Sequence, residues 1–568
     1  MNIKALLHKS DSKFCFPTSK NTLVLRLQAD KEDIFDRVEV IYGSKYTIYL
    51  KQQKAIMEVK YVDKLYNYYE VELELEDVRL SYVFCLWKDN KPFYFSEDGI
   101  TEFYDFKLSY YNSFQMPYIH ESDLHKMVPW MENAVFYQIF IDRFRQGNKE
   151  KDQSYLNLHW GDIPHPKSFA GGDLDGIIEK LDYIKGLGVN ALYLTPVFCA
   201  ISNHKYDISD YMNIDPHFGT NDTFTKLINE AHKRGMRVVL DAVFNHCSML
   251  LPQFQDVLKY GSSSRYFDWF MIHGDHPNPD KLNYEVFAFC NYMPKFNTNN
   301  PEVEEYLLNI ATHWIKEYDI DGWRLDVSDE VPHSFWRKFR DAVKNVKTDC
   351  VIIGENWHDA NAYLMGDQYD SIMNYAFTKA CLDYYAFETF DAKAFSNKLN
   401  HLLTRNTKQV NGMMLNLLDT HDTDRFFTSV NKNKDKLLSA IAVMTIYPGA
   451  PCLYYGTEIC LEGGYDPDNR RCFDWDESKW DYDFMTKIKD IFNLKQIEIL
   501  KKGDIQITSK GNLCYINRFY KKEEISLILN QSKKAVSLVL DGDIQVVNNY
   551  KSNQLLTDGF VIIKKERK

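Results

Sequence analysis

Hydrophobic and polar positions alternate with a period of two near both ends of the chain. Residues 22–27 and 69–75 are short alternating runs with polar breaks between such segments. This pattern is typical of half-buried strands in antiparallel sheets. The same pattern returns after about residue 495, for example in residues 525–529. We therefore predict an N-terminal β-sandwich over residues 1–122 and a C-terminal β-domain over residues 496–568.

Between these ends, short apolar runs alternate with amphipathic stretches of helical period. Residues 175–187 and 222–234 each carry apolar side chains on one helical face, and Gly188 and Gly235 follow them as predicted C-terminal helix stops. The eight strand candidates are residues 135–140, 189–196, 237–244, 322–327, 351–355, 371–375, 413–418 and 451–455. Eight strands that each precede a helix predict a (β/α)8 TIM barrel, here over residues 123–495.

One connection of the predicted barrel is much longer than the others. Residues 246–300, after the third strand, are rich in aromatic residues, proline and asparagine. We expect this insertion to form a small subdomain that overhangs the barrel mouth. The fold class is thus α/β, with a barrel between two β-domains.

Charge and composition exclude several classes of partner. The 568 residues include 68 Lys and Arg against 80 Asp and Glu, and no basic stripe is present, so nucleic acid is a poor partner. No apolar run is long enough for a signal-peptide core or a membrane span, which predicts an unexported protein without a membrane partner. Eleven scattered cysteines without metal-type spacing favour reduced thiols and a cytoplasmic location.

Polar residues gather at the ends of four predicted strands. The third strand runs into Asp241 and His246, the fourth ends in Asp326, the fifth in Glu355, and the seventh is followed by Asp422. A single carboxylate at a strand end is more often a cap or a surface charge. In a barrel, however, the C-terminal strand ends form the active site, and converging ionised groups repel one another unless chemistry requires them.

These segments resemble the conserved regions of the α-amylase family of glycoside hydrolases, in order from about residue 135 to residue 475. Residues 188–196 (GVNALYLTP) and 449–458 (GAPCLYYGTE) are similar to the family's strand-two and strand-eight regions. Residues 293–296 (MPKF) and 204–207 (HKYD) are similar to the neopullulanase, cyclomaltodextrinase and maltogenic amylase group. That group also has an N-terminal β-sandwich.

The resemblance implies catalytic roles that the chemistry also requires. Retaining cleavage needs an ionised carboxylate and a protonated carboxyl about 5 to 5.5 Å apart. The resemblance assigns Asp326 as nucleophile, Glu355 as acid/base and Asp422 as the supporting third carboxylate. Arg324 shares a strand face with Asp326 and is expected to keep it ionised. Trp357 and an apolar wall are expected to keep Glu355 protonated by desolvation.

The resemblance further implies a set of substrate contacts. Tyr206 is expected to stack under the sugar, His246 and His421 to hydrogen-bond it, and Asp466 with Arg470 to close the donor end. Phe287, Met293 and Trp357 would line the acceptor side, although a core role for Phe287 and Met293 is equally consistent with the sequence. With Arg324, the implied substrate-binding residues are Tyr206, His246, Phe287, Trp357, His421, Asp466 and Arg470.

Two stretches depart from the group's pattern. The group often has a calcium loop after the first strand, but residues 146–152 here include Lys151, whose charge opposes a cation. The residues whose oxygens could still bind calcium are Asn148, Asp152, Gly171 and Asp173. We expect no bound metal and no cofactor. The second departure is residues 327–330 (VSDE), where the group commonly reads VANE, and it leaves the fine specificity open.

The sequence therefore predicts a retaining hydrolase of α-1,4 glucosidic bonds in cyclodextrins, maltodextrins or pullulan. It leaves open α-1,6 cleavage, transglycosylation and the preferred substrate. The alternatives are a maltodextrin glucosidase or a glucanotransferase with the same triad, and a catalytically silent sugar-binding protein, which would be expected to lack one of the three carboxylates. A homodimer is implied by the resemblance alone.

Overall fold

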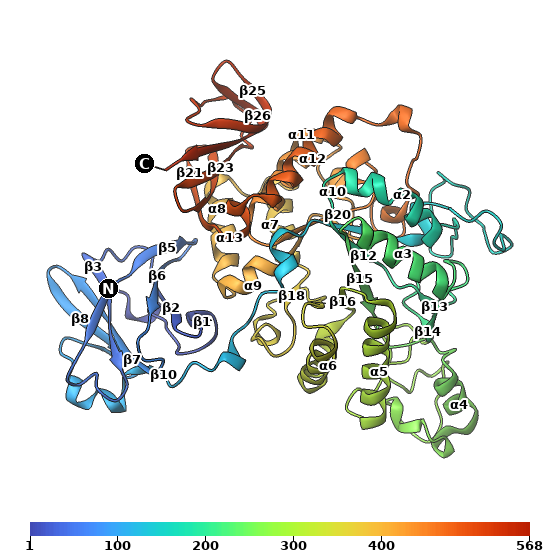
Figure 1. Ribbon diagram of the computed structural model, residues 1–568, viewed down its shortest axis with the longest axis horizontal. Coiled ribbons are helices and arrows are strands. Elements are labelled where there is room, and N and C mark those ends of the chain that lie inside the picture. Colours follow the sequence, from blue (N-terminus) through green and yellow to red (C-terminus); the bar gives the residue numbers. More distant parts are fainter. Residues whose placement is uncertain (568) are drawn as a thin grey trace.

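The computed structural model describes residues 1–567 as three packed parts (Figure 1). The N-terminal part consists of two antiparallel sheets that share one core. The first has the order β1 (Cys15–Ser19), β2 (Thr22–Asp30), β6 (Tyr66–Glu74) and β5 (Glu58–Val62). The second has the order β4 (Gln53–Ile56), β3 (Arg37–Ser44), β7 (Leu80–Lys88), β8 (Lys91–Ser96) and β9 (Gly99–Thr101), with β10 (Phe114–Met116) beside β7. The predicted sandwich is thus present.

The middle part is a barrel of eight parallel strands, as predicted. Its order is β18 (Ser371–Ile372), β17 (Val351–Gly354), β16 (Gly322–Leu325), β15 (Arg237–Ala242), β12 (Ala191–Leu194), β11 (Phe136–Ile139), β20 (Ala450–Tyr454) and β19 (Leu415–Leu417). A parallel bridge between Met373 and Leu415 joins the two ends of this sheet. Each strand falls within one of the eight predicted runs or begins one residue before it.

Helices surround the barrel and begin where their sequences provide caps. Asp173 accepts a hydrogen bond from the Gly176 N–H at the start of α2, and Gly188, with φ of 90°, follows the end of that helix. The longer helices are α2 (Leu174–Gly186), α3 (Asn221–Lys233), α5 (Pro301–Tyr318), α6 (His333–Val346), α8 (Ala392–Leu403), α11 (Lys434–Ile446) and α12 (Tyr482–Asn493). The shorter ones are α1 (Ile141–Phe144), α4 (Pro252–Tyr260), α7 (Tyr375–Cys381), α9 (Lys408–Met413), α10 (Phe426–Ser429) and α13 (Glu498–Lys502).

The long connection after β15 contains α4 and a set of single bridges rather than a regular sheet. Its bridges include His246 with Lys295 and Val286 with Pro294, so the insertion folds back on its own start. A second, two-stranded excursion after β12 consists of β13 (Phe198–Ala200) and β14 (Ile208–Ile214). Both excursions lie at the C-terminal ends of the barrel strands.

The C-terminal part is one antiparallel sheet packed on α8 and α11. It has the order β21 (Asp504–Lys510), β22 (Leu513–Tyr520), β23 (Glu523–Asn530), β26 (Gln554–Glu566) and β24 (Val536–Ser537), with β25 (Asp543–Lys551) beside β26. Arg518 of β22 donates to the backbone oxygens of Ile446, Leu500 and Gly503, which joins the sheet to the barrel. Within residues 1–567, no helix combines the length and the apolar character that a membrane crossing requires.

Candidate active site

The alternation of side chains along each barrel strand determines which residues reach the mouth. Val239 and Ile353 point into an apolar layer inside the barrel. Asp241 and Glu355 lie two residues further along the same strands and therefore on the same inward side. The inward positions thus change from apolar to charged at the C-terminal end, where the chain builds a polar cluster.

Arg324 is the hub of this cluster. Its Nη1 lies 2.8 Å from Asp326 Oδ1 and 3.0 Å from both carboxylate oxygens of Asp241. Its Nη2 lies 2.8 Å from Glu355 Oε2. All four side chains are buried. Since one guanidinium contacts Asp326 and Glu355 at once, the two candidate catalytic carboxylates face the same small space, as the sequence predicts.

Burial and the charge of Arg324 act on the pKa of Asp326 in opposite directions. Burial raises the pKa of Asp326 well above its usual range, and the carboxylates of Glu355, Asp241 and Asp422 raise it further. Arg324 acts in the predicted direction, lowering this pKa, but burial outweighs it. Arg324 is the cation that favours the ionised form of Asp326, and the ionised state itself stays a prediction.

Glu355 is held by donors rather than by an apolar wall. Its Oε2 accepts the Val327 N–H at 2.9 Å and forms an ion pair with Arg324 Nη2 at 2.8 Å, and its Oε1 accepts the Trp357 indole N–H at 3.3 Å. Trp357 is 53% exposed and stacks on Tyr375 with ring centroids 3.6 Å apart. The indole lies at the rim and contacts Glu355 through its N–H, so a desolvating role for Trp357 stays a prediction.

The third carboxylate, Asp422, lies beside Arg470, one of the residues predicted for the donor end. Asp422 contacts Arg470 Nη2 at 3.3 Å and His421 Nε2 at 3.2 Å. Arg470 Nη1 also pairs with Asp466 Oδ1 at 2.9 Å. Asp422 remains about a third exposed, so its carboxylate is open to the cleft. These four residues form one connected group, as predicted.

The two histidines of the predicted sugar contacts are both uncharged. Burial lowers the pKa of His246 to about 3 and the pKa of His421 well below its usual value. His246 Nε2 is buried without a hydrogen-bond partner and lies 4.0 Å from Asp326 Oδ2, so it is free for a sugar hydroxyl. Its ring stacks on Phe287 with centroids 4.7 Å apart, which places Phe287 at the cleft.

Tyr206 is fixed by hydrogen bonds as well as by its ring. Its hydroxyl lies 2.8 Å from Asp241 Oδ2 and 2.5 Å from His421 Nε2, and its ring is parallel to the His421 ring. The hydroxyl can donate to Asp241 while the neutral imidazole contributes the second hydrogen bond. The tyrosine face is thereby held at the cleft, where a pyranose ring could pack against it.

The charged cluster forms the floor of a cleft of about 860 Å³. All of the predicted site residues except the fully enclosed Arg324 and His421 line it. Its lining residues include His204, Tyr206, His246, Phe287, Asp326, Glu355, Trp357, Asp422, Asp466 and Arg470. A volume of this size accommodates a ligand of several rings.

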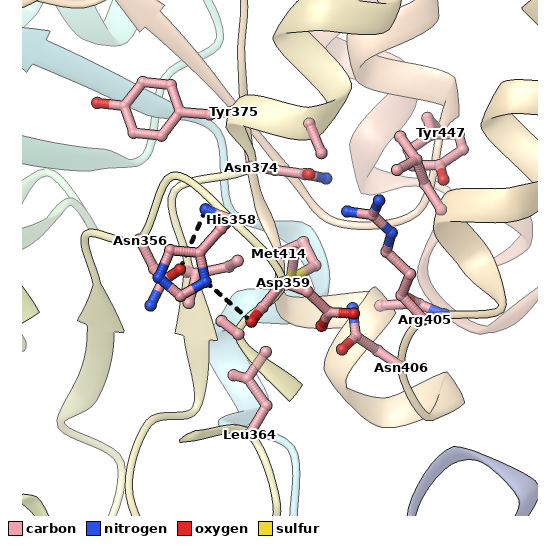
Figure 2. A pocket seen from close by; sticks show the side chains of 15 residues that line it. Asn356, His358, Asp359, Leu364, Asn374, Tyr375, Arg405, Asn406, Met414 and Tyr447 are labelled. Atoms are coloured by element: carbon pink, nitrogen blue, oxygen red, sulfur yellow. Dashed lines mark hydrogen bonds between the residues drawn. The ribbon is translucent and has the colours of Figure 1, made fainter. Parts of the chain in front are cut away.

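A second, much smaller cavity lies behind Tyr375 (Figure 2). It measures about 20 Å³, which is room for little more than a water molecule. Figure 2 shows Asn356, Asn374 and Arg405 around it, with the His358 N–H donating to Asn356 Oδ1 at 3.2 Å. This polar space supports the wall of the cleft and is too small for a sugar.

Sequence reasoning missed Asp241 as a site residue. Asp241 accepts from Arg324, Tyr193 and Tyr206, and burial raises its pKa to about 6. Asp241 pairs with Arg324 across the neighbouring strands β15 and β16, and this pairing would identify Asp241 as a site residue. The pairing follows only from the register of the barrel, and the sequence predicts the strands without their register. His204 and Tyr375 were missed for the same reason.

A cleft with paired carboxylates at the C-terminal end of a (β/α)8 barrel defines the class of barrel glycoside hydrolases. Residues 138–502 match the family model described as alpha amylase, catalytic domain. Residues 1–120 match the model described as alpha amylase, N-terminal ig-like domain. The chain belongs to the α-amylase family of glycoside hydrolases.

Individual relatives agree over nearly the whole chain. A cyclomaltodextrinase from Thermoanaerobacter pseudethanolicus is 40% identical over 547 residues, which are 95% of this chain and 94% of that protein. An intracellular maltogenic amylase from Bacillus subtilis is 39% identical over 94% of this chain and 91% of its own length. A solved cyclomaltodextrinase structure superimposes with a TM-score of 0.91 at 36% identity, covering 100% of this chain and 98% of that one.

Proposed function

We propose that the chain hydrolyses α-1,4 glucosidic bonds of small maltodextrins and cyclodextrins with retention, using Asp326 and Glu355. An Asp326 oxygen bonds to the anomeric carbon while the glycosidic bond breaks and its oxygen takes the proton of Glu355. Glu355 then removes a proton from water, the water oxygen bonds to the anomeric carbon, and Asp326 leaves. The observation that carries this proposal is the contact of Arg324 with both carboxylates.

The remaining residues act on the sugar rather than on the bond. Asp422, with Arg470 and His421 behind it, would bind hydroxyls and favour the distorted ring of the transition state. The unpartnered His246 Nε2 would donate to a hydroxyl near Asp326. Trp357 at the open rim would stack on the acceptor sugar. The contacts of Asp422 and His246 are made to the sugar whose ring flattens, so they lower the barrier if they strengthen in the transition state.

The choice of substrate rests on the relatives' names together with the size of the cleft. A glucosidase or a glucanotransferase with the same triad is the alternative. Product analysis on α-cyclodextrin, pullulan and maltotriose separates these functions. Ring opening to maltose supports our proposal, glucose released singly from chain ends would indicate a glucosidase, and longer products would indicate a transferase.

The mechanism is tested by comparing wild type with Asp326→Asn and a matched control, Asp329→Asn. Asp329 also lines the cleft but pairs with His358 instead of Arg324. We expect Asp326→Asn to lose at least about 10³-fold of kcat and Asp329→Asn to keep most of it. Equal, negligible release of reducing sugar from wild type and Asp326→Asn would refute the enzyme proposal. Formation of the β-anomer first would refute retention.

We also propose that the loop after β11 needs no calcium because Lys151 takes the place of the cation. Lys151 Nζ lies 2.8 Å from the Gly171 oxygen, 2.7 Å from the His217 oxygen and 2.9 Å from Asp173 Oδ2. The other predicted oxygens are engaged locally: Asn148 accepts from the Glu150 N–H, and Asp152 accepts from Ser154. An ammonium among these oxygens leaves no site for a second cation.

This proposal predicts a thermal midpoint that neither EDTA nor added calcium changes. Lys151→Met should lower the stability by about 3 kcal/mol, because it leaves Asp173 and two carbonyls without their charged donor. Lys149→Met is the control, since Lys149 is exposed in the same loop. Stoichiometric calcium in the purified protein would overturn the proposal.

For the assembly, we propose a homodimer in which the sandwich of one subunit covers the barrel mouth of the other. Support comes from the relatives and from exposed aromatic side chains on the sandwich. Phe103, Tyr110 and Tyr111 are 76%, 70% and 82% exposed. Only monomer in sedimentation at micromolar concentration would refute this. We propose a cytoplasmic location, supported by the relative named intracellular and by eleven cysteines that form no disulfide within residues 1–567.

A further inference from the structure

The turn that follows the candidate nucleophile has an unfavourable backbone conformation. Val327, directly after Asp326, has φ of 45° and ψ of 42°, in the left-handed region. A β-branched residue rarely adopts this conformation, which is unfavourable without support from neighbouring contacts. The surrounding contacts must therefore hold the turn in place, and they show what it does.

The turn forms hydrogen bonds with both the side chain and the backbone of Glu355. The Val327 N–H donates to Glu355 Oε2 at 2.9 Å. The next residue, Ser328, donates its hydroxyl to the backbone oxygen of Glu355 at 2.6 Å. Side chain and peptide of the same residue are thus fixed by two consecutive residues of the neighbouring strand's loop.

Ser328 is itself rigidly placed and cannot touch a substrate. It is 0% exposed, and its backbone oxygen accepts from Trp336 Nε1 at 2.8 Å and from the Tyr369 hydroxyl at 3.0 Å. Gly354, just before Glu355, makes this approach possible. A Cβ there would lie 2.6 Å from the Tyr369 ring and 3.1 Å from Ser328 Oγ.

The donors around Glu355 distinguish its two oxygens. Oε2 faces Arg324 Nη2 and the Val327 N–H, and neither of these groups can accept a proton. A hydrogen on Oε2 would point at one of two donors. Oε1 has only the long contact to Trp357 Nε1 at 3.3 Å. Oε1 is thus the oxygen that can carry a hydrogen toward the cleft.

We propose that the Val327–Ser328 turn positions Glu355 so that Oε1 delivers the proton to the glycosidic oxygen, and that Ser328 is a positioning residue for this step. The inference rests on the proposed function of Glu355 as acid/base. Loss of the Ser328 hydroxyl removes the hydrogen bond to the Glu355 backbone oxygen, so that Oε1 is no longer held in position to deliver its proton. It leaves Asp326 and the sugar contacts as they are.

The test uses two substrates that differ in their need for an acid. Maltotriose has a poor leaving group that must be protonated, whereas α-maltosyl fluoride has a leaving group that needs far less help. We expect Ser328→Ala to lower kcat/KM on maltotriose about tenfold and to keep kcat/KM on the fluoride within about twofold, because kcat/KM reports the step in which the leaving group departs. Ser328→Cys, similar in size and a weaker donor, should give an intermediate loss on maltotriose.

Ser439→Ala is the matched control, because Ser439 is equally buried and bonds Tyr385 at 3.0 Å in α11, away from the cleft. It should not change the ratio of the two activities. Equal losses on both substrates, or no loss on maltotriose, in both Ser328 variants would overturn the inference. Absence of activity in the wild type on both substrates would instead refute the proposed function on which it rests.

Discussion

Lys495 is a buried ammonium without a carboxylate partner, and its replacement should stabilise the protein. The side chain is 1% exposed, and Nζ donates to the Gly449 oxygen at 2.6 Å, just before β20. Burial, reinforced by the charge of Arg518, lowers the pKa of Lys495 from 10.5 to about 7. The Glu132 carboxylate opposes this shift only weakly, as the last of the causes.

The size of the effect follows from the two pKa values. The difference between 10.5 and about 7 corresponds to roughly 5 kcal/mol of cost for the charged form in the folded state. The hydrogen bond to Gly449, lost in a Lys495→Met variant, returns about 1.5–3 kcal/mol. We therefore expect Lys495→Met to be more stable than wild type by about 2 kcal/mol at pH 6.

The sign of the pH dependence is fixed by the direction of the shift. Between about pH 7 and pH 10.5 the unfolded chain binds more protons at Lys495 than the folded chain, so wild-type stability rises with pH over that window. The advantage of Lys495→Met should be full below pH 7 and should shrink as the pH rises. Differences between variant and wild type cancel the titration of other groups.

Thermal midpoints of wild type, Lys495→Met and the exposed control Lys489→Met, measured from pH 6 to pH 9.5, test this reasoning. The control should follow wild type at every pH. A Lys495→Met variant that is less stable than wild type at pH 6 would show that the Gly449 hydrogen bond outweighs desolvation. An advantage that does not change with pH would show that Lys495 titrates normally.

Three further predictions concern the cleft. Arg324→Lys should lower kcat by about 10² to 10³ at similar KM, because a single ammonium cannot contact Asp241, Asp326 and Glu355 in one plane; steady-state kinetics on maltotriose would contradict this if kcat were unchanged. Tyr206→Phe keeps the ring but removes the hydroxyl that contacts Asp241, so we expect about a tenfold loss of kcat with a small change in KM. Trp357→Ala should raise KM for longer substrates about two- to tenfold, which corresponds to about 0.5–1.5 kcal/mol of lost stacking, while changing α-maltosyl fluoride hydrolysis little. A larger effect on the fluoride would contradict an acceptor-side position.

The sequence predicted the eight strands because they are short apolar runs, some of them next to capped, amphipathic helices such as α2 and α3. Predicted and observed helices agree closely, as for residues 222–234 and α3 (Asn221–Lys233). It also predicted which strand ends carry the chemistry, since polar residues there interrupt an otherwise apolar pattern. Both conclusions depend on local periodicity, which a single sequence displays directly.

What the sequence did not reveal depends on contacts across strands. The pairing of Asp241 with Arg324 requires the barrel register, and the exposed position of Trp357 requires the height of its loop above the mouth. The conformation of Val327 is hidden for a different reason. A valine gives no sign of a left-handed backbone, so only the tertiary contacts around Glu355 reveal it.

The cluster around Arg324 has a stability cost that is inseparable from its chemistry. Because burial raises the pKa of Asp241 to about 6, the folded state binds more protons there than the unfolded chain between about pH 4 and pH 6. The stabilising contribution of that retained proton is lost as the pH rises through about 6. At neutral pH one guanidinium therefore faces carboxylates that it cannot fully compensate. Asp326 and Glu355 line the cleft, so we expect the hydroxyl donors of a bound sugar to offset part of this uncompensated charge.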